Sequence, residues 1–252
     1  MNNLENILYI ISTPIGNLND ISLRAKETLK NVEFIICENP KHSLKLLNKL
    51  GIKKKLFALH DYNEKKLIKK IDKYAGSYPI ALISDAGAPL ISDPGFNLVK
   101  DFIKKDIGIT GVPGPSSVIS SIQLSGLPTN NFIFFGFVPK NINAAKLIVK
   151  RASEIGLTSI FYISGNRLKK FLEILVKNSQ NPKIAVCKEL TKKNEAIFRD
   201  NLKNIIKKIT KKEINLKGEF TLVLDFINNN SKKTINDAIK TQILKLLKKY
   251  TL

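Results

Sequence analysis

Two aspartates in one short loop are the residues whose types and spacing best suit a ligand site. Asp85 and Asp93 lie in residues 84–95, a stretch rich in Gly and Pro that follows an apolar run. A loop at the carboxyl end of a buried strand is where open α/β sheets bind ligands. Two carboxylates would repel a pyrophosphate, and they would suit hydroxyls, an amine or a sulfonium cation. The loop therefore predicts a site for a neutral or cationic ligand.

The first half of the chain alternates between short apolar strands and helices. This alternation is typical of a mostly parallel sheet. Each strand ends in a polar or Gly/Pro-rich loop, and the carboxyl ends of parallel strands share one edge of a sheet. We therefore expect five loops to meet along that edge, namely residues 13–19, 38–42, 60–63, 85–95 and 113–117.

The second half of the chain follows a linker-like stretch at 126–131 and differs from the first half in its sequence pattern. It begins with an aromatic strand at 132–138, predicted to be buried on both faces, and continues with further strands and helices. The predicted fold class is therefore α/β, with two α/β domains. Their predicted limits are 1–115 and 116–230, and a basic C-terminal helix is predicted in 231–252.

A net charge of +21 raises the expectation of a polyanionic partner. Only four of the basic residues are arginine, and the others are lysine. Base-edge recognition in nucleic acids usually uses arginine, so the composition favours contact with a nucleic-acid backbone. A coding bias toward lysine explains the same composition equally well.

Several kinds of chemistry are disfavoured by the residues present. Cys37 and Cys187 lie far apart in apolar runs and are predicted to be buried thiols, and only two histidines are present, so no metal site is expected. No dinucleotide or P-loop fingerprint and no nucleophile elbow occurs. The first residues resemble no signal peptide and no apolar run could span a bilayer, which predicts a soluble cytoplasmic protein without a membrane.

Methyl transfer from S-adenosylmethionine fits the remaining inventory. This reaction needs alignment of the attacking atom with the methyl carbon and exclusion of water, and it needs little covalent help from the protein. Carboxylates and backbone carbonyls suit the ribose hydroxyls, the amino group and the sulfonium of that cofactor.

An ordered set of motifs across residues 8–227 resembles the tetrapyrrole-methylase superfamily. The resemblance is closest to the branch that methylates the ribose 2′-hydroxyl of a cytidine in 16S ribosomal RNA of the small subunit. Any one motif is weak, but the ordered set is highly specific. The matching stretches are residues 9–25, 59–64, 84–95, 113–115, 126–128, 161–162, 189–192 and 217–219.

The resemblance implies two α/β domains with S-adenosylmethionine in the cleft between them, and usually a homodimer. Gly87 could alternatively serve plain turn geometry, and Asp93 could cap the following helix. By this likeness, the cofactor-binding residues are Pro14, Asp85, Gly87, Ala88, Pro89, Ser116, Ser117, Leu190 and Gly218.

Methylation of a hydroxyl benefits from a base, and several candidates lie on the predicted edge. We hypothesise that His60 or Asp61 assists proton removal or orients the ribose, with an ordinary loop histidine as the alternative for His60. The other candidates on this edge are Glu38, Lys41 and His42. Glu189, Lys192 and Glu195 are expected on the second domain.

Two departures from the pattern of this branch remove carboxylates. The branch usually has Glu-Asp-Thr-Arg-His where this chain has Glu38-Asn39-Pro40-Lys41-His42, and Phe-Tyr-Glu-Ser where it has Phe161-Tyr162-Ile163-Ser164. These losses leave a non-catalytic RNA-binding protein of the same fold as one alternative. A methylase of a small tetrapyrrole is the other.

Overall fold

The computed structural model describes residues 4–179 and 182–226. The predicted helix in 231–252 lies outside these residues. Contacts divide the chain into two compact units between Ser120 and Ser121, a few residues after the predicted boundary. The first unit is Met1–Ser120 with Glu189–Glu195, and the second is Ser121–Lys188 with Ala196–Leu252.

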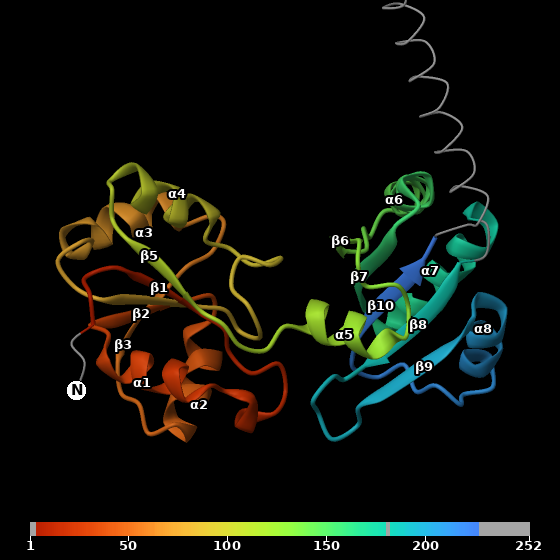
Figure 1. Ribbon diagram of the computed structural model, residues 1–252, viewed down its shortest axis with the longest axis horizontal. Coiled ribbons are helices and arrows are strands. Elements are labelled where there is room, and N and C mark those ends of the chain that lie inside the picture. Colours follow the sequence, from red (N-terminus) through yellow and green to blue (C-terminus); the bar gives the residue numbers. More distant parts are fainter. Residues whose placement is uncertain (1–3, 180–181, 227–252) are drawn as a thin grey trace, which may run out of the picture. The chain divides into compact units, whose positions relative to one another are not determined.

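A five-stranded sheet with the order β3-β2-β4-β1-β5 forms the centre of the first unit (Figure 1). All neighbouring pairs are parallel, as predicted, so the carboxyl ends of the strands share one edge. In the register, Leu8 of β1 pairs with Ile80 of β4 and with Ile109 of β5. The strands are β1 (Leu8–Ile11), β2 (Phe34–Cys37), β3 (Lys55–Ala58), β4 (Ile80–Ile83) and β5 (Ile109–Val112).

Helices cover both faces of this sheet (Figure 1). Alternate side chains of each strand point to opposite faces, so Ile35 packs in one core and Ile36 in the other. The helices α1 (Leu23–Asn31) and α2 (Pro40–Lys49) cover the first core, and α3 (Glu64–Ile71) and α4 (Phe96–Lys104) cover the second. Short 3₁₀ turns lie at η1 (Leu18–Asp20) and η2 (Asp72–Tyr74).

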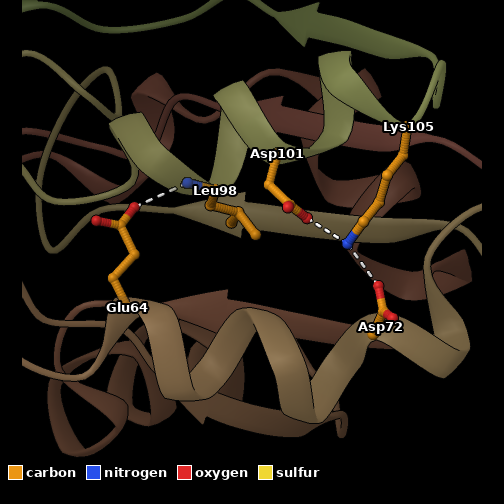
Figure 2. Close-up of polar contacts among 5 residues, drawn as sticks. All are labelled: Glu64, Asp72, Leu98, Asp101 and Lys105. Carbon is orange, nitrogen blue, oxygen red and sulfur yellow. Dashed lines mark hydrogen bonds and ion pairs between the residues drawn. The ribbon is translucent and has the colours of Figure 1, made fainter.

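Figure 2 shows that α3 and α4 are tied together near both of their ends. At one end, the buried carboxylate of Glu64 accepts hydrogen bonds from the backbone N–H of Leu98 at 2.9 Å and from Asn97 Nδ2 at 2.8 Å. At the other end, Lys105 bridges Asp72 at 2.5 Å and Asp101 at 2.6 Å. Because Gly95 supplies no side-chain cap to α4, Glu64 takes over the capping of that helix.

Replacing Glu64 with Ala is expected to lower the free energy of unfolding by about 2 kcal/mol. The physical reason is that the buried N–H of Leu98 loses its acceptor. Urea unfolding followed by circular dichroism measures the change. Glu27→Ala, at an exposed position on α1, is the control. An equal loss in both variants would contradict the capping role.

The second unit contains a mixed five-stranded sheet with the order β6-β7-β10-β8-β9. Three helices pack on one face of it, and the end of α5 (Ser117–Ser125) lies on the other, where Arg199 donates hydrogen bonds to the carbonyls of Leu124 and Ser125. The strands are β6 (Phe132–Phe137), β7 (Thr158–Ser164), β8 (Lys183–Lys188), β9 (Ala196–Asn201) and β10 (Glu219–Asp225). The three helices are α6 (Ile142–Ile155), α7 (Gly165–Asn178) and α8 (Leu202–Thr210).

The structure differs from the sequence-based expectations at three elements of this unit. Neither α6 nor β9 was predicted. β9 is hard to recognise because it is an edge strand whose sequence contains Arg, Asp and Asn. The prediction that the strand at 132–138 is buried on both faces is wrong. β6 is the other edge strand, and the side chain of Phe137 is 63% exposed.

Two further observations concern the sequence-based exclusions. Cys37 and Cys187 are both free and buried, which confirms their prediction as buried thiols. Among the residues that the structure describes, no helix has the length and apolar character needed to cross a membrane.

Candidate functional site

Three neighbouring strands of the first sheet end in acidic loops. Glu38 follows β2, His60 and Asp61 follow β3, and Asp85 follows β4. Since these strands are adjacent in the order β3-β2-β4, their loops lie together at the carboxyl edge. Asp93, from the same loop as Asp85, is close enough to Glu38 and Asp85 to feel their charges.

Burial and the charge of neighbouring carboxylates raise the pKa values of Glu38 and Asp93. The pKa of Glu38 is raised first by burial and then by the negative charge of Asp85, while His60 acts in the opposite direction. Burial, followed by the charge of Glu38, raises the pKa of Asp93 to about 6, and a hydrogen bond from Ser84 opposes that rise. A cationic group placed here would relieve the repulsion.

Asn39 joins two of the acidic loops. Its backbone N–H donates to the Asp85 carboxylate at 3.2 Å, and its side-chain oxygen accepts from the N–H of Lys41 at 3.1 Å and of His42 at 3.4 Å. Asn39 is therefore the N-cap of α2, and Pro40 occupies the first helical turn, where proline is favoured. The departure at 39–40 thus keeps the helix start intact. Lys41 and His42 are exposed on its first turn.

The glycine-containing loop after β4 is held against the loop after β1. Thr13 and Gly87 exchange two backbone hydrogen bonds, of 2.9 and 3.1 Å, and thereby form an isolated antiparallel bridge. Gly87 has a φ of +85°, and a Cβ at this position would lie 3.1 Å from Ile15 Cγ2. This bridge places Pro14, which follows Thr13, beside the segment from Asp85 to Pro89.

The loop between β8 and β9 belongs to the first unit, although its catalytic candidates were expected on the second domain. The backbone N–H of Asn17 donates to Thr191 Oγ1 at 3.1 Å, and Gly16 packs against Leu190, Thr191 and Lys192. These contacts bring Leu190 to the loop after β1. The expected placement of residues 189–195 is wrong because the loop leaves its own sheet and packs on the first unit.

Backbone strain is concentrated in two of these loops. Of the six non-glycine residues with positive φ among those described, Leu90 and Ser92 precede Asp93, and Glu189 and Thr191 lie in the loop after β8. Such conformations cost free energy and persist where the surrounding structure imposes them, and they cluster at binding sites.

Replacing Gly16 with Ala is expected to detach the loop at 189–195 from the loop after β1. A Cβ on Gly16 would lie 2.9 Å from Thr191 Oγ1 and would also collide with Lys192 Cγ. We expect a loss of about 1–2 kcal/mol in the free energy of unfolding, as is typical of overpacking. Gly111→Ala is the matched control, because nothing lies within 4 Å of its Cβ position. A similar loss in both variants would contradict the close approach.

The remaining cofactor candidates lie at two other places. Ser117 is the first residue of α5, and Ser116 directly precedes it, where the Ser116 carbonyl accepts from the N–H of Ser120 at 2.9 Å. Gly218, with a φ of +114°, precedes β10 in the second unit, whereas the other cofactor candidates belong to the first unit. Asp93 was predicted to lie in the ligand loop, but it is not among the cofactor-binding residues that the family resemblance implies. The alternative that Asp93 caps α4 is wrong, since Gly95 is the N-cap and has no side-chain cap.

Among residues 4–179 and 182–226, no group of three or more His, Cys, Asp or Glu side chains is arranged to hold a metal ion. The carboxylates of the edge therefore form an acidic surface without the arrangement of a ligand set.

Solved structures show which fold this is. Diphthine synthase matches with a TM-score of 0.67 at 14% identity, covering 86% of this chain and 89% of that chain. Cobalt precorrin-4 methyltransferase matches with a TM-score of 0.62 at 15% identity, covering 87% of this chain and 94% of that chain. These similarities confirm the predicted α/β fold.

Relatives of known name are more similar in sequence. A protein of Haemophilus influenzae is 39% identical over 249 residues, covering 98% of this chain and 87% of the relative. One of Rickettsia prowazekii is 42% identical over 236 residues, covering 92% and 83%. Both are named ribosomal RNA small subunit methyltransferase I. The family model described as Tetrapyrrole (Corrin/Porphyrin) Methylases matches residues 7–206. The chain therefore belongs to the tetrapyrrole methylase family.

Proposed function

We propose that this protein transfers a methyl group from S-adenosylmethionine to the ribose 2′-hydroxyl of a cytidine in 16S ribosomal RNA. The observation that carries the proposal is the group of half-buried carboxylates Glu38, Asp85 and Asp93 at the carboxyl edge of the first sheet. It occurs in a chain that is 39% identical over 249 residues to a named small-subunit ribosomal RNA methyltransferase.

The residues present at this edge fit S-adenosylmethionine. The edge offers carboxylate and carbonyl acceptors and repels phosphate, which suits a ligand with ribose hydroxyls, an amino group and a sulfonium. When bound, this cofactor supplies a methyl group on a positively charged sulfur. The residues proposed to hold it are Pro14, Asp85, Gly87, Ala88, Pro89, Ser116, Ser117, Leu190 and Gly218.

The same edge offers a group that can take the proton of the ribose hydroxyl. A carboxylate is a better base when its pKa is raised toward the working pH, and the pKa of Glu38 is raised by burial and by Asp85. His60 and Asp61 are exposed on the loop after β3, where Asn63 fixes the His60 backbone through a 2.8 Å hydrogen bond. We assign proton removal to Glu38, with His60 or Asp61 orienting the ribose.

Lys41 has a separate place in this proposal. It lies in the first turn of α2, three residues after Glu38, and its side chain is exposed. A lysine there keeps a positive charge for a phosphate of the RNA, although it lacks the two-pronged geometry of arginine. We further propose that the enzyme works as a homodimer, which light scattering of the full chain measures.

Transfer of a tritiated methyl group to isolated small ribosomal subunits, followed by nucleotide mapping, tests the function. We expect label on the ribose of one cytidine of 16S ribosomal RNA. Label on a base or on protein would reject the ribose assignment. Methylation of a small tetrapyrrole without transfer to the subunit would favour the other activity of this family. Calorimetry with S-adenosylmethionine that shows no binding would favour a non-catalytic RNA-binding protein.

A further inference from the structure

Lysines are concentrated along one edge of the first sheet. β3 is the outermost strand there, and residues 40–73, which include α2, β3 and α3, contain eleven lysines and three acidic residues. By contrast, the segments 23–33 and 96–106 each contain three basic and two acidic residues. A coding bias toward lysine would act on all these segments of the first unit alike, so it does not account for the difference between them.

The acidic residues of this region do not neutralise its lysines. Glu64 is buried and caps α4, and Asp72 pairs with Lys105 of α4. Asp61 lies close enough to Glu38 to raise its pKa. Within residues 4–179 and 182–226, none of the eleven lysines forms an ion pair. Their charge is therefore available to a partner.

Contacts between β3 and α3 place several of these lysines on one surface. The ammonium groups of Lys55 and Lys70 each lie 5.2 Å from the centre of the Phe57 ring, so they are no further apart than twice that distance. Lys66 lies one turn before Lys70 on the same side of α3. We call this surface the basic edge and define it as Lys53, Lys54, Lys55, Lys66, Lys70 and Lys73.

Protection of an exposed strand explains only part of this pattern. Edge strands often carry lysine because a charge there prevents pairing with other chains. Lys55, on the strand itself, is sufficient for that role. The lysines of α3 do not lie on the strand, and two cations held over one ring repel each other unless an anion approaches.

We propose that the basic edge binds the phosphate backbone of the RNA substrate. The inference rests on the proposed function and adds to it the surface of this chain that holds the RNA. Lysine ammonium groups act as point charges and suit phosphates rather than base edges. The basic edge runs alongside β3, whose carboxyl end leads into the loop of His60 and Asp61. RNA bound along it would thus reach the acidic edge where the chemistry is proposed.

Binding of the full chain to 16S ribosomal RNA at several salt concentrations tests this inference. The variant K53Q/K55Q/K66Q/K70Q removes four charges from the basic edge. The matched control K30Q/K100Q/K104Q/K146Q removes four exposed charges elsewhere. The edge variant is expected to bind roughly tenfold or more weakly, and its salt dependence is expected to fall by about one unit of slope for each lost phosphate contact. The control is expected to stay within about twofold of the parent.

Further measurements separate the possible outcomes. Arginine at the same four positions of the edge is expected to restore binding, which also guards against misfolding of the glutamine variant. Equal RNA binding by the edge variant and the control would overturn the inference. The inference would also be overturned if the edge variant lost binding to phosphatidylserine vesicles but still bound RNA like the parent. If the parent chain methylates small subunits while the edge variant keeps its KM for them, the proposed function stands and the inference fails. If the parent transfers no methyl group, the proposed function fails, and the RNA-binding comparison still decides the inference.

Discussion

Asp85→Asn is expected to weaken the binding of S-adenosylmethionine by roughly 10- to 100-fold, the range that a lost charge-assisted hydrogen bond produces. Asp85 carries a charge that acts on both Glu38 and Asp93, and it accepts the backbone N–H of Asn39 at 3.2 Å. The amide keeps an oxygen for Asn39 and removes the charge. The loss should therefore appear in affinity for a cationic ligand more than in folding. Isothermal titration calorimetry measures it.

Two comparisons isolate the charge of Asp85 in this experiment. S-Adenosylhomocysteine lacks the sulfonium, so its affinity is expected to fall less in the same variant. Asp106→Asn, at an exposed residue after α4, is the protein control and is expected to bind the cofactor like the parent. Equal losses for the two ligands would show that the sulfonium does not lie in the field of this carboxylate.

The affinity for S-adenosylmethionine is expected to depend on pH through Asp93, whose pKa is about 6. A cation favours the ionised carboxylate, so affinity should fall as the pH drops through 6. The expected loss is about tenfold between pH 7.5 and pH 5. Asp93→Asn should bind more weakly at pH 7.5 and should lose most of this dependence. An unchanged pH profile in that variant would exclude Asp93 from the site.

The contribution of Asp93 to the free energy of unfolding is expected to depend on pH in the opposite direction to its contribution to cofactor affinity. The pKa of an aspartate is ordinarily 3.8, the value taken for the unfolded chain, and the pKa of Asp93 is about 6 in the folded protein. Folding therefore favours the protonated form of Asp93. The stabilising contribution is complete below pH 3.8 and is lost as the pH rises through 6. Because the side chain is only half-buried, solvent screens the repulsion, and Asp93→Asn is expected to gain about 1 kcal/mol at pH 7.5. Thermal unfolding measures this gain, with Asp20→Asn, at an exposed position, as the control. A loss of stability in Asp93→Asn would contradict the expectation.

The strand ends of the first unit could be read from the sequence because their signals are local. The apolar run at β1 and the Gly/Pro turn after β4 identify their own boundaries. β9 could not be read in this way, since pairing with β8 stabilises a strand whose second half, Arg-Asp-Asn, is polar. The role of Glu64 was equally hidden, because its partner Leu98 lies 34 residues away.

The sequence by itself determined the types of residue at the site: the carboxylates after β2 and β4 exclude phosphate whatever their exact arrangement. Only the tertiary structure decided which of them act together. The order β3-β2-β4 brings Glu38 next to Asp85 and Asp93, although their loops lie far apart in the chain. Burial at that edge then raises the pKa values of Glu38 and Asp93, and burial is a property of the packed fold that no single segment contains.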